Sequence, residues 1–68
     1  MSVQQLNYYE FLQRKWLYAW NTWMRLKNGR NWILAMVYYD AMVELENQLC
    51  KLVPSEEVEQ WMEQFFNN

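Results

Sequence analysis

The chain has 68 residues, six basic and eight acidic side chains and no histidine, which gives a net charge of −2. A chain of this length forms at most one domain, and a core this small contributes only about 3–5 kcal/mol of net stability on its own. Small proteins usually add a disulfide, a metal ion or a partner. Cys50 is the only cysteine, which excludes a disulfide within one chain, and without histidine a tetrahedral zinc site lacks ligands. Association with another protein, or with a second copy, is the remaining source of stability.

The composition favours an all-α fold. Hydrophobic residues make up 53% of the chain, and only one glycine and one proline are available for the many turns that a β-fold requires. No stretch approaches the roughly 20 apolar residues that span a bilayer. The N-terminal segment lacks the basic region and apolar core of a secretory leader. We therefore expect a cytoplasmic protein that is not inserted in a membrane.

A first helix is predicted over residues 3–27. Apolar side chains recur there at steps of three and four, which is typical of a helix that packs along one seam: Tyr9, Leu12, Trp16, Ala19, Trp23 and Leu26. The opposite side carries polar residues seven apart: Asn7, Arg14, Asn21 and Asn28. Further apolar side chains lie between these two stripes, so we expect this helix to have two neighbours.

The segment 27–31 predicts the end of one helix and the start of the next. Gly29 is expected in the left-handed conformation that ends many helices, and Asn31 is expected to cap a second helix over residues 32–53. The seam of this second helix again steps by three and four: Ala35, Tyr38, Met42, Leu45, Leu49 and Leu52. Two amphipathic helices of similar length joined by a short break predict an antiparallel hairpin.

A third, shorter helix is predicted over residues 55–66, with Ser55 as its N-cap. Its apolar face consists of Val58, Trp61, Met62 and Phe65. This helix has about half the length of the hairpin, so it folds back over only part of it and completes a three-helix bundle within a single domain, residues 1–68. A second copy could extend the bundle. Trp16 and Trp61 are expected in the core. The hairpin end that remains uncovered is expected to hold Trp20, Trp23, Trp32, Ile33 and Met36.

The sequence shows no catalytic, cofactor-binding or metal-binding motif. Cys50 has no histidine to activate it and is interpreted as a half-buried small hydrophobe. The acidic residues do not form the alternating pattern of a calcium loop and are interpreted as solvated helix faces. We therefore expect a protein that is not an enzyme and takes no metal, cofactor or small-molecule substrate.

Five tryptophans are more than a three-helix core of this size hides, and tryptophan is enriched at binding hot spots. We predict a protein–protein interaction module, acting as an adaptor, chaperone-like subunit or inhibitor. Phage-encoded inhibitors of host proteins are similar in size and build. A homodimer through the same surface is compatible with this prediction. The predicted partner-binding residues are Trp20, Trp23, Arg25, Arg30, Trp32, Ile33, Met36 and Tyr39.

The charge distribution leaves an alternative open. Residues 1–30 carry a net charge of +4 and residues 31–68 carry −6. The basic and aromatic patch Arg25–Trp32 could bind nucleic acid in a dimeric helical regulator, by neutralising phosphates and stacking bases. The small number of basic residues favours the protein-binding interpretation.

Overall fold

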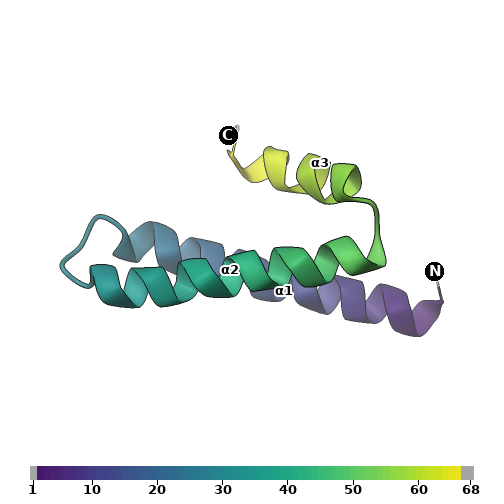
Figure 1. Cartoon of the computed structure of the whole chain (residues 1–68), viewed down its shortest axis with the longest axis horizontal. Helices are drawn as coiled ribbons and strands as arrows, with labels where there is room; N and C mark the ends of the chain where they lie inside the picture. Colours follow the sequence, from purple (N-terminus) through teal and green to yellow (C-terminus); the bar gives the residue numbers. More distant parts are fainter. Residues whose placement is uncertain (1, 67–68) are drawn as a thin grey trace.

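The computed structural model describes residues 2–66, which form three α-helices: α1 (Val3–Leu26), α2 (Trp32–Leu52) and α3 (Ser55–Phe66). Helices α1 and α2 pack side by side as an antiparallel hairpin, and α3 turns back beside the hairpin and ends partway along it (Figure 1). The predicted all-α fold, with a long hairpin and a short third helix, is confirmed. The first two helices end one residue earlier than expected. Within the described residues, no helix is long and apolar enough to cross a membrane.

The helical seams predicted from the spacing of apolar residues are the buried sides of α1 and α2. The buried seam residues are Leu12, Trp16 and Ala19 of α1 and Ala35, Met42 and Leu49 of α2. The polar residues expected on the opposite side of α1 are all exposed: Asn7, Arg14, Asn21 and Asn28. Because each helix buries one stripe and exposes the other, the two seams face each other along the hairpin.

Helix α3 closes the core through its predicted apolar face. Val58 is buried against Leu12 and Leu49, and the partly buried Trp61 and Met62 pack against both this cluster and the neighbouring cluster of Trp16, Ala19 and Met42. Trp61, expected in the core, is therefore only half-buried. Tyr9 packs at the edge of the first cluster, where burial raises the pKa of its phenol above 10.0 and the charge of Glu57 raises it further.

Trp16 is the side chain on which all three helices meet. It has no exposed surface. The Trp61 ring of α3 meets it edge-on at 5.3 Å, and its own Nε1 donates a hydrogen bond to Oε1 of Glu46 on α2 at 3.1 Å. A buried indole N–H without an acceptor is costly, so this bond makes the full burial of Trp16 possible.

The turn between α1 and α2 corrects one prediction. Gly29 was expected in the left-handed conformation, but no glycine within residues 2–66 has a positive φ. Instead α1 ends in a right-handed turn at Lys27, whose φ is −62° and ψ is −27°. The Gly29 N–H donates to the Leu26 carbonyl at 3.0 Å, so a donor for this carbonyl is found without a left-handed residue.

Three further details differ from expectation. Asn31 is the N-cap residue of α2 but makes no side-chain cap hydrogen bond. Ser55 is the first residue of α3, and the carbonyl of Pro54 accepts the first helical bonds from Glu57 and Val58. Cys50 is exposed, not half-buried, because it lies about 100° around α2 from the seam residue Leu49.

Replacing Trp16 by alanine is expected to lower the free energy of unfolding by about 3–5 kcal/mol, or to unfold the chain outright. The loss has two sources, the cavity among three helices and the unpaired Glu46 carboxylate. Urea unfolding followed by far-UV circular dichroism measures it. Trp32→Ala is the matched control, because Trp32 is 61% exposed and should change stability by less than about 0.5 kcal/mol. Equal losses in the two variants would contradict the assignment of Trp16 as the centre of the core.

Gly29→Ala tests the right-handed turn. An added Cβ would lie 3.5 Å from the Leu26 carbonyl oxygen, an ordinary contact. Alanine restricts the unfolded chain more than glycine does, so the variant should be as stable as the parent or more stable by about 0.4–1 kcal/mol. A left-handed Gly29 would instead make the variant less stable by roughly 1–2 kcal/mol. The same urea titration distinguishes the two outcomes.

Candidate interaction surface

Helix α3 covers only the part of the hairpin away from the α1–α2 turn (Figure 1). Its last aromatic residues, Phe65 and Phe66, lie against Trp20 of α1, with ring centroids 6.4 and 6.1 Å from the Trp20 ring. Toward the turn, the same face of the hairpin continues without a covering helix. The face on which α3 packs therefore has a covered half and a bare half.

The bare half is formed mainly by one stripe of α2. Trp32, Met36, Tyr39 and Val43 follow one another at steps of four, three and four, which places them on one side of the helix. Their exposed fractions are 61, 56, 50 and 39%. The next step of the same stripe is Glu46, which binds Trp16 on the side covered by α3. The stripe therefore runs from the bare half into the covered half.

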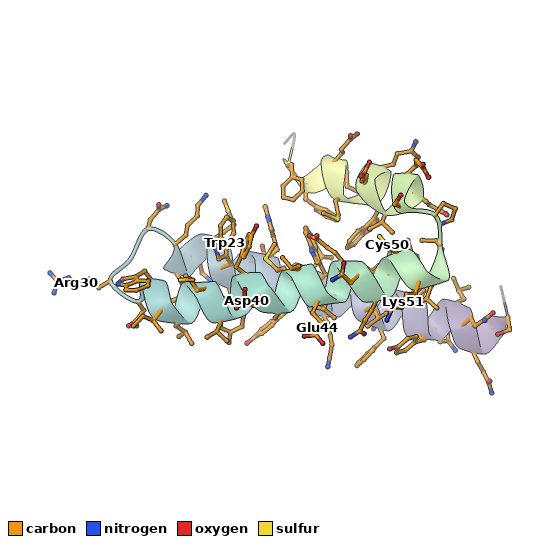
Figure 2. The ribbon with its side chains drawn as sticks, in the orientation of Figure 1. Trp23, Arg30, Asp40, Glu44, Cys50 and Lys51 are labelled. Atoms are coloured by element: carbon orange, nitrogen blue, oxygen red, sulfur yellow. The ribbon has the colours of Figure 1, made fainter. Side chains whose placement is uncertain are left out.

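The half-buried Trp23 of α1, which no residue of α3 covers, borders this bare half from the neighbouring helix. Its ring lies 5.9 Å from the ring of Tyr39, and Lys27 Nζ lies 4.9 Å from its centroid. Figure 2 shows Trp23 rising from α1 on the side where α3 lies. Contacts on two sides hold this indole in place, so it forms a fixed part of the surface. We call Trp23, Trp32, Met36, Tyr39 and Val43 the loop-end surface.

A hollow of about 360 Å³ separates the loop-end surface from the end of α3. Its walls are aromatic, formed by Trp20 and Trp23 on one side and by Phe65 and Phe66 on the other, with Lys27 at the edge. Among residues 2–66, the buried Nε1 of Trp20 has no hydrogen-bond partner. The hollow continues the apolar character of the loop-end surface up to the edge of α3.

Four of the eight predicted binding residues come together in this surface: Trp23, Trp32, Met36 and Tyr39. Trp20 does not belong with them. It was expected to lie beyond the reach of the third helix, but it is half-buried because the aromatic side chains at the end of α3 extend over it. The prediction that Trp20 is uncovered is therefore wrong.

The remaining predicted residues are exposed but are placed elsewhere. Arg25 follows Trp23 by two residues and so points about 200° away from it around α1. Ile33 is 67% exposed and lies about 100° around α2 from Trp32. Arg30 extends from the turn at the end of the hairpin (Figure 2). These three residues lie outside the apolar row of the loop-end surface.

Val43 is a residue of this surface that the sequence prediction missed. Extending the steps from Trp32 through Met36 and Tyr39 by four more residues would have found it. Lys27, which covers part of the Trp23 ring, needed the fold, because its contact depends on how α1 ends. Within the described part of the chain, no group of three or more acidic, cysteine or histidine side chains could hold a metal ion.

Comparison with known proteins does not identify a relative. The chain matches no protein-family model, no curated protein and no solved structure. Function must therefore be argued from the chemistry of the surface itself.

Proposed function

We propose that this chain is a non-enzymatic protein–protein interaction module that binds a partner protein through the loop-end surface. The observation that supports the proposal most directly is the uncovered row of Trp32, Met36 and Tyr39, each at least half exposed. Scattered exposed apolar residues are ordinary on a protein surface, whereas a continuous row with a fixed tryptophan beside it is typical of a binding site.

The side chains of this row are of the kinds that carry binding energy. Tryptophan and tyrosine are enriched among hot-spot residues, and methionine adapts its shape to irregular partners. Complete burial of one large apolar side chain contributes about 1.5–3 kcal/mol. A dissociation constant of about 1 µM corresponds to a binding free energy of about −8.2 kcal/mol. Burial of Trp32 and Met36 together would therefore supply a substantial part of that free energy.

The hairpin presents this row with little need for rearrangement. Trp32 and Met36 lie on a regular helix whose other side is packed against α1, and Trp23 is already held by Tyr39 and Lys27. Less conformational entropy is lost when the binding residues are ordered before the partner arrives. An adaptor, a chaperone-like subunit and an inhibitor would all bind their partner through a preordered surface of this kind. A cytoplasmic setting would also keep the exposed Cys50 reduced.

The alternative is a regulator that binds nucleic acid through Arg25, Lys27 and Arg30. The packing of Trp23 favours the protein partner, because Lys27 and Tyr39 already occupy positions against its ring where a base would stack. Arg25 also points away from Trp23. A nucleic-acid complex would weaken steeply with added salt, whereas a complex built on the apolar row would not.

Affinity capture with surface variants tests this proposal. The tagged chain is incubated with lysate of its native host, with and without nuclease, and the affinity of the recovered protein is then measured with purified components. Trp32→Ala and Met36→Ala should each weaken binding, with about a 30-fold loss for Trp32→Ala, since hot-spot truncations cost about 2 kcal/mol or more.

Val3→Ser is the matched control. Val3 is 75% exposed at the far end of α1 and should leave the affinity unchanged. Unchanged affinity in both Trp32→Ala and Met36→Ala would reject the loop-end surface. Recovery that disappears after nuclease treatment would transfer support to the nucleic-acid alternative.

A further inference from the structure

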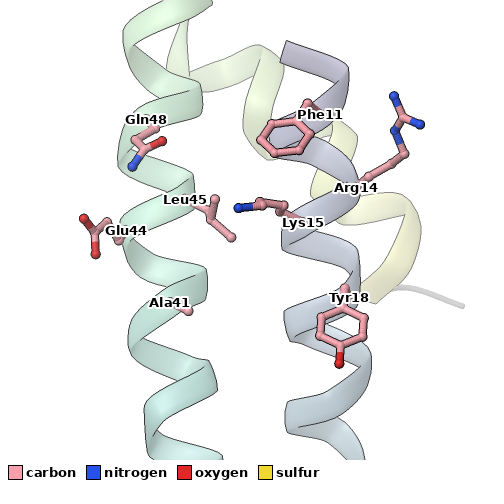
Figure 3. Close-up of a pocket in the computed structure, with 8 residues that line it drawn as sticks. All are labelled: Phe11, Arg14, Lys15, Tyr18, Ala41, Glu44, Leu45 and Gln48. Carbon is pink, nitrogen blue, oxygen red and sulfur yellow. The ribbon is translucent and has the colours of Figure 1, made fainter. Parts of the chain in front are cut away.

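The face of the hairpin opposite α3 carries an open groove of about 670 Å³ between α1 and α2 (Figure 3). Its aromatic wall consists of Phe11 and Tyr18 on α1, which are 46 and 64% exposed. Ala41 and Leu45 of α2 line the other side. Helix α3 lies behind the hairpin in this view, so it covers none of these residues. The hairpin therefore has a second apolar face, separate from the loop-end surface.

The two edges of this groove carry opposite charges. Arg14 and Lys15 lie on the α1 edge, and Glu44 lies on the α2 edge. The helices as wholes show the same polarity, because α1 has three basic and one acidic residue and α2 has one basic and three acidic residues. Lys15 Nζ lies 4.8 Å from the centroid of the Phe11 ring and reaches across the groove in Figure 3. The groove thus has apolar walls, a basic α1 side whose Lys15 extends over the groove, and an acidic α2 edge.

We propose that the occupant of this groove is a second copy of the chain, docked face to face in a two-fold homodimer. A face with one basic and one acidic edge is complementary to itself, as a two-fold interface requires. The small core gives a second reason. Only seven hydrophobic residues within the described chain are buried, and chains of this size commonly gain the missing stability by oligomerisation.

The charges also select one of the two possible two-fold arrangements. If the axis runs across the helices, α1 lies on α1 of the second copy, and Arg14 and Lys15 meet their own equivalents. If the axis runs parallel to the helices, α1 lies on α2 of the second copy, and the basic edge meets the acidic edge. Like charges that face each other across an interface are destabilising, so the parallel axis is favoured.

The register of the hairpin agrees with the parallel axis. The hydrogen bond from Trp16 to Glu46 and the packing of Ala19 with Met42 set the position of α1 relative to α2 along the helix axes. A two-fold rotation about an axis parallel to the helices leaves each residue at the same position along that axis. Lys15 then lies close to the level of Glu44 of the second copy, and the large Tyr18 close to the level of the small Ala41.

This dimer would be a four-helix bundle of two hairpins with one α3 on each outer side. The parallel axis places both turns at the same end, where each copy keeps its own loop-end surface free. The proposal does not rest on the proposed function, since the two use different faces. Trp32→Ala should leave the dimer intact, which keeps the failure of one proposal separate from the failure of the other.

Sedimentation velocity of the full chain tests the dimer. The protein concentration is varied from about 1 to about 100 µM, the order of magnitude of the dissociation constants expected for such a dimer. The salt concentration is kept low so that surface charges are not screened. The parent should sediment as a dimer. Lys15→Glu places glutamates opposite Glu44 of the second copy, and Glu44→Lys places lysines opposite Lys15. Each single variant should weaken dimerisation by at least about tenfold.

The decisive experiment is sedimentation of an equimolar mixture of the Lys15→Glu and Glu44→Lys variants. In the proposed dimer, both edge contacts of a mixed pair join opposite charges, so the mixture should form dimers that contain one of each variant. Circular dichroism checks that both variants fold, and Ala41→Lys serves as a second disrupting variant if either does not. A monomeric parent, single variants that dimerise like the parent, or a mixture that stays monomeric would each overturn the proposal.

Discussion

The burial of Trp16 is the constraint on which the rest of this structure depends. A 68-residue chain has few ways to build a core, and here one indole is surrounded by all three helices. Its ring fixes the position of α3 through the contact with Trp61. Its N–H fixes the position of α2 along the hairpin axis through the hydrogen bond to Glu46. Both contacts are specific in direction, so Trp16 sets the register of the hairpin and the side on which α3 packs.

The length of α3 then decides what is left uncovered. Twelve residues of helix reach about 18 Å, whereas α2, with 21 residues, reaches about 32 Å. Phe65 and Phe66 extend the cover as far as Trp20. The apolar stripe of α2 continues past that point, and its exposed part is the loop-end surface. A longer third helix would have buried the same residues as core.

The two sides of the hairpin differ in their chemistry. The α3 side beyond Phe66 is apolar and aromatic, with one lysine against Trp23. The opposite side is an apolar groove with a basic edge on α1 and an acidic edge on α2. The first kind of surface suits a partner that offers an apolar face of its own. The second has the charge pattern on which the proposed homodimer rests. Because these two faces lie on opposite sides of the hairpin, the proposed homodimer and the proposed partner complex would not compete for the same residues.

The sequence by itself determined the helices, their seams and the hairpin, because apolar residues such as Leu12, Trp16, Met42 and Leu49 recur at helical spacing along one seam of each helix. It also predicted that the third helix would be too short to cover the hairpin. Only the tertiary structure decided where that cover stops, since the reach of Phe66 over Trp20 depends on ring positions that spacing does not contain. The conformation of Gly29 was likewise decided by the turn, where a right-handed backbone already gave the Leu26 carbonyl a donor. The sequence shows that the chain has more aromatic residues than its core can hold. The packing around Trp16 determines which of them are buried and which are exposed.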